Sequence, residues 1–211
     1  MRFREVEIVS PSPPDAVRFY GERLGLQTRG AAVVVGASVL RFTAGTPAAP
    51  YHLAFNIPSN QIAAAKTWAE TRLPMLSDEI FDFDFWEAEA IYFEDRDGNV
   101  LELIARRRLG NPSEVAGGPG LLLEISEVGL PVADPPAAVE QLEGVLGLDV
   151  YSGNRASFTA VGDDEALFIV VPPGRTWLPT DRTGAESPAR VVVDAPRSGA
   201  LTLGAVEIIS G

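Results

Sequence analysis

Hydrophobic residues recur along this chain in two different patterns, and each pattern predicts one kind of element. Short β-branched runs bounded by glycine, proline and polar residues are typical of strands, whereas apolar residues three and four positions apart are typical of helices. In the segment 14–24, Ala16, Tyr20 and Leu24 follow helical spacing, and the segment 60–73 shows a similar pattern. Each helix is therefore expected to place one apolar face against a sheet.

The strands expected around these two helices fall into two groups. The first group is 3–9, near 27, 31–35 and 38–44, and the second is 51–57, near 80, 88–93 and 99–105. In each group one strand precedes the helix and three follow it. The first half of the chain therefore predicts two units of the β-α-β-β-β type.

An internal repeat extends this organisation into the second half. Residues Glu5–Leu26 align without a gap on Glu127–Leu148, sharing Glu-Val at the start, Pro-Pro and Ala-Val in the middle, and Leu-Gly-Leu at the end. A third unit is therefore expected over 125–171. The fourth unit is too short to hold a helix between its opening strand, 190–194, and its closing strand, 204–209.

Composition and linkers predict two tandem domains. With 211 residues, of which 46% are hydrophobic, the chain can bury one large core or two modest ones. Polar residues, glycine and proline replace periodic apolar residues in the segment 106–120. We expect a first domain at 1–108, a linker at 109–120, and a degenerate second domain at 121–211 that serves packing, dimerisation or closure of a cavity. The three arginines at 106–108 are interpreted as solvated charges at the domain edge.

Charge and composition also exclude several classes of function. The formal net charge of −12 argues against binding to nucleic acid, which requires a cationic surface. The absence of cysteine excludes disulfides, thiolate metal sites and cysteine nucleophiles. The N-terminus lacks the apolar core of a signal peptide, and no apolar run approaches the ~20 residues that span a bilayer. A cytoplasmic protein with no membrane partner is expected.

The most informative motif is a hairpin that carries a carboxylate among apolar neighbours. Two β-rich runs, 91–93 and 100–104, are joined by Asp-Arg-Asp-Gly-Asn, a turn whose glycine and asparagine tolerate positive φ. Glu102 lies in the middle of the second run. Burying an ionised carboxylate without compensation is costly, so Glu102 either faces water or meets a cation or metal.

This hairpin resembles the closing hairpin of a βαβββ module in the vicinal oxygen chelate superfamily, which includes glyoxalase I, bleomycin-resistance proteins and extradiol dioxygenases. The resemblance implies an α+β fold of paired βαβββ modules, in two tandem domains with the last module truncated. It also implies metal ligands at Glu5, His52 and Glu102, of which His52 is the sole histidine of the chain. The corresponding positions of the second half include Arg190, and because an arginine is not a ligand, no metal site is expected there.

The implied ligand set is one imidazole and two carboxylates, which suits a divalent Fe, Mn, Ni or Zn ion. The first ligand departs from the histidine of dioxygenases, which favours a Lewis-acid role over oxygen activation. Glu89 and Tyr92 are candidates for moving protons. Arg41 falls near the fourth ligand position of glyoxalase I, where it either binds an anionic substrate group or pairs with one of the acids.

Aromatic and acidic residues alternate in the segment 80–86, and this run is the candidate substrate pocket. Phe81, Phe83 and Trp86 could line an apolar cavity, although a core strand explains the run equally well. Each candidate also has an ordinary structural interpretation: His52 as a hydrogen-bonded core residue, Glu5 as a solvated strand residue.

The sequence is compatible with three functions. The leading hypothesis is a metal-dependent lyase, isomerase or ring-cleaving dioxygenase acting on a small molecule with vicinal oxygens. The alternative is a metal-free protein of the bleomycin-resistance kind, which would sequester a small cationic ligand. The third is a structural module whose sites are vestigial. The resemblance implies a small-molecule partner and allows a homodimer.

Overall fold

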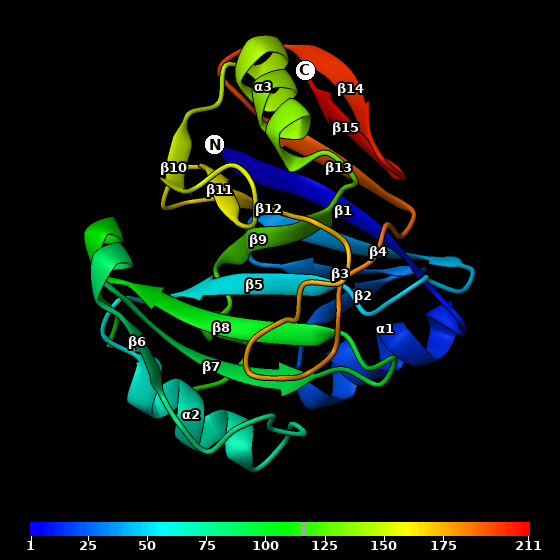
Figure 1. Cartoon of the computed structure of the whole chain (residues 1–211). Helices are drawn as coiled ribbons and strands as arrows, with labels where there is room; N and C mark the ends of the chain where they lie inside the picture. The colour runs from blue at the N-terminus through cyan, green and yellow to red at the C-terminus, as the bar shows by residue number, and fades with distance from the viewer. Residues whose placement is uncertain (115–116) are drawn as a thin grey trace.

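The computed structural model describes residues 1–114 and 117–211, and within these ranges the strands form a seven-stranded and an eight-stranded sheet (Figure 1). The strand order in the seven-stranded sheet is β14 (Gly199–Leu203), β15 (Val206–Ser210), β13 (Ala189–Asp194), β1 (Arg2–Ser10), β4 (Ser38–Ala44), β3 (Ala32–Val35), β2 (Gln27–Arg29). The order in the eight-stranded sheet is β10 (Val150–Gly153), β11 (Thr159–Gly162), β12 (Leu167–Val171), β9 (Glu124–Pro131), β5 (His52–Ile57), β8 (Val100–Arg106), β7 (Ala88–Glu94), β6 (Phe81–Phe83).

The helices lie close to the predicted positions. They are α1 (Pro13–Arg23), α2 (Ile62–Glu70) and α3 (Pro135–Leu146), with short 3-10 turns η1 (Asp84–Trp86), η2 (Arg107–Leu109) and η3 (Pro119–Leu121). Helix α3 begins at two prolines after Asp134, whose side chain accepts a hydrogen bond from Ala137 N, and ends at Gly147 in the left-handed conformation. In the fourth unit, β13, β14 and β15 follow one another without a helix, so the prediction of a truncated last module is confirmed.

The four modules pair in an order that differs from the sequence-based expectation. The first module pairs with the fourth through the antiparallel strands β1 and β13, and the second pairs with the third through β5 and β9. Each sheet therefore combines strands from both sides of the predicted 109–120 linker, whereas the sequence analysis grouped the first two modules into one domain. The boundaries at 108 and 121 stay a prediction.

The largest apolar cluster lies between the two sheets. The rings of Phe3 on β1 and Phe168 on β12 meet edge to face, with centroids 5.0 Å apart, and both side chains are fully buried. A smaller cluster, which includes Ala54, Tyr92 and Ile169, covers the other face of the eight-stranded sheet. Because strand side chains alternate between faces, this sheet buries apolar residues on both sides. The second face is where the candidate site lies.

The connection between β12 and β13, residues 172–188, passes across this second face (Figure 1). Arg182 anchors it to the hairpin between β7 and β8 through an ion pair with Glu94 and a 3.0 Å hydrogen bond from Nη1 to the carbonyl oxygen of Gly98. Among the described residues, no helix is long and apolar enough to cross a membrane.

Candidate metal centre

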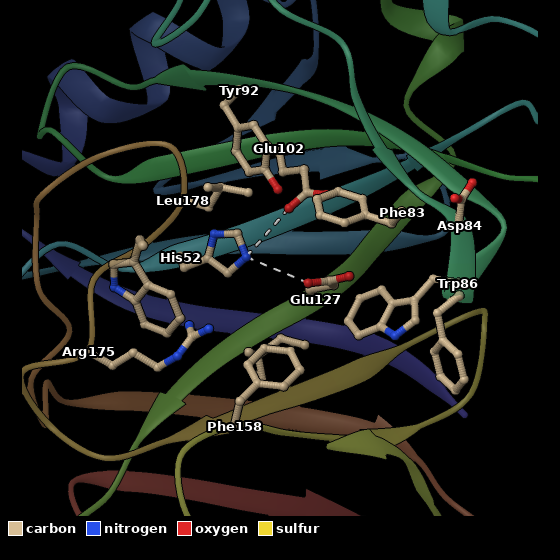
Figure 2. A pocket seen from close by; sticks show the side chains of 13 residues that line it. His52, Phe83, Asp84, Trp86, Tyr92, Glu102, Glu127, Phe158, Arg175 and Leu178 are labelled. Carbon is tan, nitrogen blue, oxygen red and sulfur yellow. Dashed lines mark ion pairs between the residues drawn. The ribbon is translucent and has the colours of Figure 1, made fainter. Parts of the chain in front are cut away.

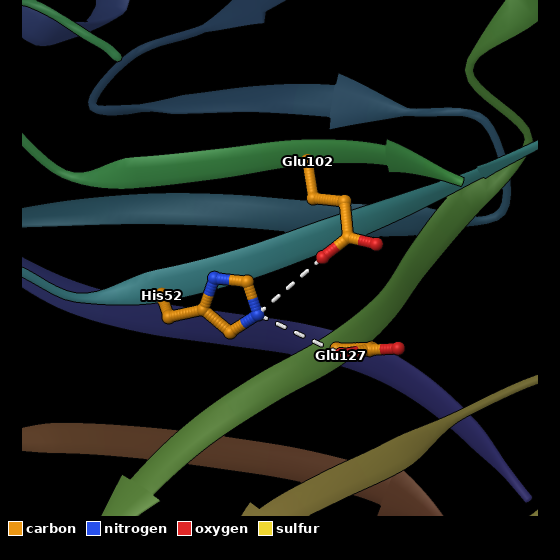
Figure 3. Close-up of side chains that lie close together, drawn as sticks. All are labelled: His52, Glu102 and Glu127. Atoms are coloured by element: carbon orange, nitrogen blue, oxygen red, sulfur yellow. Dashed lines mark ion pairs between the residues drawn. The ribbon is translucent and has the colours of Figure 1, made fainter. Parts of the chain in front are cut away.

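Three buried side chains converge on the second face of the eight-stranded sheet. They are His52 on β5, Glu102 on β8 and Glu127 on β9, and their potential ligand atoms all lie within 4.8 Å of one another (Figure 3). The residues are 6%, 3% and 3% exposed. Carboxylates are almost never buried to this extent without a compensating partner, so the cluster demands a charge balance.

Strand register explains the convergence. β5 runs parallel to β8 and antiparallel to β9, and the same residue, Ala54, is the cross-strand partner of both Glu102 and Glu127. His52 precedes Ala54 by two positions, so its side chain lies on the same face. Because Ala54 is small, the two acidic side chains have room above it to approach the imidazole.

The imidazole of His52 is oriented so that one nitrogen faces both acids. Nδ1 lies 3.2 Å from the carbonyl oxygen of Val100, and because a carbonyl can only accept, Nδ1 carries the hydrogen in this contact. In the neutral imidazole Nε2 is then the acceptor, and it lies 3.7 Å from Glu102 Oε2 and 3.6 Å from Glu127 Oε2. Trp177 stacks on the ring with centroids 5.0 Å apart. A backbone carbonyl that fixes the other ring nitrogen is the arrangement typical of metal-binding histidines.

The built-in cations of the cluster do not suffice to keep both of its carboxylates ionised at neutral pH. Burial and the neighbouring charge of Glu127 raise the pKa of Glu102 to about 8. Burial lowers the pKa of His52, but the carboxylates of Glu127 and Glu102 and the contact with Val100 outweigh it, so the pKa is raised. Burial and the charge of Glu102 also raise the pKa of Tyr92, so its phenol stays protonated. A bound cation would relieve the imbalance that these shifts report.

One cation, Arg106, already lies against these acids, and its position differs from the sequence-based prediction. Arg106, which was interpreted as a solvated charge, is fully buried and its Nη2 forms an ion pair with Glu127. Its guanidinium also lies 5.4 Å from the centre of the Trp86 ring, while its Nε and Nη1 have no hydrogen-bond partner among the described residues. Strand alternation from Glu102 places Arg106 on the same face, and this was the signal in the sequence.

Glu5 is not part of the cluster, so the structure brings together only two of the three predicted ligands. It lies on β1 in the other sheet, where the Arg41 guanidinium binds its carboxylate at 3.2 and 2.9 Å. The reason is the module pairing: β1 is next to β13 and β4, not next to β5 or β8. Glu127, the repeat counterpart of Glu5, takes the third position. Of the two roles considered for Arg41, the structure shows the pairing with an acid.

The predicted proton-transfer residues separate onto two faces of β7. Tyr92 is the cross-strand partner of Glu102 and lines the pocket. Glu89 lies on the opposite face, since Ala88, Ala90 and Tyr92 alternate with it, and its carboxylate is 3.8 Å from Arg107. Glu89 therefore cannot act on a substrate next to Glu102.

A pocket of about 410 Å³ opens beside the three ligand candidates (Figure 2). The remaining residues that line it are Phe83, Asp84, Phe85, Trp86, Tyr92, Phe158, Ile169, Arg175, Trp177 and Leu178. Phe83 and Trp86 thus line the pocket, as the sequence predicted. Phe81 is not among the lining residues; its ring packs edge to face against the Tyr92 ring, with centroids 5.2 Å apart. Sequence reasoning missed Phe158, which immediately precedes β11, and the residues of the 172–188 connection, because that connection has no periodic pattern.

The fourth ligand position of the paired modules holds an apolar residue. Glu102 on β8 is paired with the residue two positions after His52, and Ile169 on β12 is paired with Gly129, two positions after Glu127. Ile169 therefore corresponds to Glu102 and lines the pocket without offering a ligand. One imidazole and two carboxylates remain, a donor set that fits Fe, Mn, Ni or Zn with open positions for substrate.

Comparisons with known proteins agree with the fold. No family model and no curated protein matches the sequence. Among solved structures, a Bacillus subtilis protein proposed to be a dioxygenase is 14% identical, with a TM-score of 0.64, and the match covers 100% of this chain and 85% of that one. A glyoxalase I variant from Zea mays is 11% identical with a TM-score of 0.56, covering 99% of this chain and 93% of that chain. The predicted α+β fold of paired modules, of the glyoxalase type, is confirmed.

Proposed function

We propose that this chain, which has the glyoxalase-type fold, is a metal-dependent enzyme acting on a small molecule with two adjacent oxygens. His52, Glu102 and Glu127 would hold a divalent ion, and the open side of the ion would face the aromatic pocket. The observation that carries the proposal is the convergence of two carboxylate oxygens on the free Nε2 of His52, at 3.6 and 3.7 Å, in a buried site.

These distances suit a shared ion better than direct hydrogen bonds. A contact of 3.6 Å is too long for an N–H···O hydrogen bond. Ligand atoms bound to one Zn-like ion at about 2.0–2.2 Å stand roughly 3–3.6 Å from one another in tetrahedral or octahedral geometry. The two distances from His52 Nε2 are therefore close to the spacing that coordination requires, with Nδ1 of His52 already fixed by Val100.

The bound ion would supply Lewis-acid polarisation of the two substrate oxygens. The protein's own residues would do the rest. Tyr92, whose phenol stays protonated beside Glu102, can donate a hydrogen bond to a substrate oxygen but is a poor base at neutral pH. Trp177, stacked on His52, and Phe83 exclude water from this end of the pocket.

Elemental analysis of protein purified without chelator or affinity-tag metal tests the proposal. We expect about one divalent ion per chain in the wild type, as for a three-ligand catalytic site, and none in His52→Ala. Glu89→Gln, which removes an acid from the opposite face of the sheet, should retain the ion. A wild type without metal after incubation with Mn²⁺, Fe²⁺, Ni²⁺ and Zn²⁺ would contradict the proposal.

One observation favours a second candidate, a metal-free binding protein. Arg106 already pairs with Glu127, so one of the two acids is satisfied without an ion. The aromatic wall formed by Trp86 and Phe158 could then bind an aromatic cation, with Glu102 as its counter-charge. Binding of such a cation by metal-free wild type, but not by Glu102→Gln, would establish this alternative.

A further inference from the structure

Arg175 is the pocket residue whose charge is not balanced by the protein. It comes from the connection between β12 and β13 and lines the pocket, and among the described residues its guanidinium has no carboxylate partner. Two other arginines differ, because Arg106 pairs with Glu127 and Arg108 pairs with Glu87 at 3.1 Å.

The surroundings of Arg175 are apolar and partly closed to water. Its guanidinium lies 4.8 Å from the centre of the Phe158 ring, and it points into the pocket between Phe158 and His52 (Figure 2). Burial lowers the pKa of Arg175, and no acid offsets this effect. A partly desolvated guanidinium with free donors is a ready site for a carboxylate, which its planar fork binds through two parallel hydrogen bonds.

The backbone that carries Arg175 is held in place by its own loop. The carbonyl oxygen of Arg175 accepts a hydrogen bond from Gly184 N at 2.8 Å, and Trp177 N donates to the carbonyl oxygen of Arg182 at 2.9 Å. Trp177 in turn stacks on His52. One ordered segment therefore presents the arginine and packs against a proposed metal ligand, so both ends of a bound molecule would be positioned before it arrives.

We infer that Arg175 binds an anionic group of the substrate, so that the substrate class is an aromatic or similarly flat carboxylate whose two adjacent oxygens face His52, Glu102 and Glu127. The oxygen-binding end of this inference rests on the proposed function, whereas the anion-binding end rests on Arg175 alone. The aromatic part of this class is chosen because Trp86 and Phe158, with ring centroids 6.1 Å apart, form an aromatic wall of the pocket. The same arginine opposes the aromatic cation of the alternative function.

The test compares two probes that differ in charge alone, protocatechuate and its neutral amide, by calorimetry on Mn²⁺-loaded protein. We expect the wild type to bind the acid about ten- to hundredfold more tightly, the range of a charge-assisted hydrogen-bond pair. Arg175→Met should bind both probes with the affinity of the amide and hold as much metal as the wild type. Arg108→Met, which removes an acid-paired arginine outside the pocket, should keep the preference.

Failure of this inference is distinguishable from failure of the proposed function. A metal-loaded wild type that does not discriminate acid from amide, or a preference that survives in Arg175→Met, overturns the inference and leaves the metal site intact. A wild type that binds no metal overturns the proposed function. In that case benzoate against benzamide, which lack adjacent oxygens, tests Arg175 separately: a preference for benzoate that disappears in Arg175→Met supports the anion site, and equal binding overturns it.

Discussion

Two repeat-related acids of this molecule, Glu5 and Glu127, lie in opposite electrostatic surroundings. Glu5 is on the seven-stranded sheet with a quarter of its side chain exposed, bound by Arg41 at 2.9 Å and approached by Arg190 at 3.9 Å. Glu127 is on the eight-stranded sheet, buried with His52, Glu102 and Arg106. The same strand position thus serves an ion-pair cluster in one sheet and a candidate metal centre in the other.

The strand register shows which residues differ between corresponding positions of the two clusters. Arg41 is paired with Glu7, two positions after Glu5, and Ile169 is paired with Gly129, two positions after Glu127. Across the antiparallel pairs, Val192 is opposite Glu5 and Ala54 is opposite Glu127. Arg190 lies two positions before Val192, and His52 lies two positions before Ala54. The seven-stranded sheet therefore carries two guanidinium groups where the eight-stranded sheet carries an isoleucine and the histidine.

The direction of the pKa shifts follows from this difference. A hydrogen bond from Arg41 lowers the pKa of Glu5, whereas burial and Glu127 raise that of Glu102 to about 8. In the seven-stranded sheet, arginine side chains balance the charge of Glu5. In the eight-stranded sheet, Arg106 balances Glu127, and the charge of Glu102 still needs a proton or a bound ion. A site that leaves charge unbalanced is the one with capacity for a ligand.

The largest expected effect distinguishes the arginines of the two clusters. In metal-free protein at pH 8, Arg106→Met should reduce the free energy of unfolding by about 3–5 kcal/mol, because it leaves Glu127 buried without its partner. Arg41→Met should cost less than about 1 kcal/mol, since that pair is partly exposed. Urea unfolding measures both. The double variant Arg106→Met/Glu127→Gln should recover most of the loss, and equal losses for the two arginines would remove the contrast.

The next effect converts one cluster into the other. Ile169→Arg places a guanidinium at the position that corresponds to Arg41, where it can pair with Glu127 or Glu102. We expect metal affinity to fall at least about a hundredfold, or roughly 2.7 kcal/mol, because the new charge competes with the ion. Ile169→Met adds a side chain of similar volume without charge and should keep the ion. Competition with a chromogenic chelator measures the affinity; unchanged binding in Ile169→Arg would show that the fourth position is not next to the ion.

The sequence predicted the elements and two of the three candidate ligands because these depend on local information. The helical spacing of apolar residues predicted α1 and α2, and the turn residues between β7 and β8 predicted the hairpin. The internal repeat predicted the third module. His52 and Glu102 lie on strands of the same module, so their proximity followed from one βαβββ unit. These features are encoded by residues close together in the chain.

The third ligand and the pocket cation could not be predicted in the same way. Whether β5 pairs with a strand of the first or of the third module is a long-range choice, and it decides between Glu5 and Glu127. Arg175 lies in a segment without periodicity, so nothing local indicated that it reaches the pocket. Strand alternation did indicate the face of Arg106, but its partner Glu127 comes from the neighbouring module.

The smallest expected effect concerns Glu5, and its sign opposes that of Glu102. Because the folded state lowers the pKa of Glu5 from 4.5, its carboxylate adds stability above that pH, and the contribution is lost as the pH falls. Glu5→Gln should therefore cost less than about 1 kcal/mol at pH 7, since the pair is partly exposed, and nothing in strong acid. The raised pKa of Glu102 has the reverse consequence: metal-free protein loses stability as the pH rises from 4.5 toward about 8, and Glu102→Gln should reduce that loss, leaving the part that comes from the raised pKa of His52. Thermal unfolding across this pH range, with metal content measured on the same samples, checks both variants. Glu5→Gln should bind metal like the wild type, and a loss of metal there would return Glu5 to the ligand set.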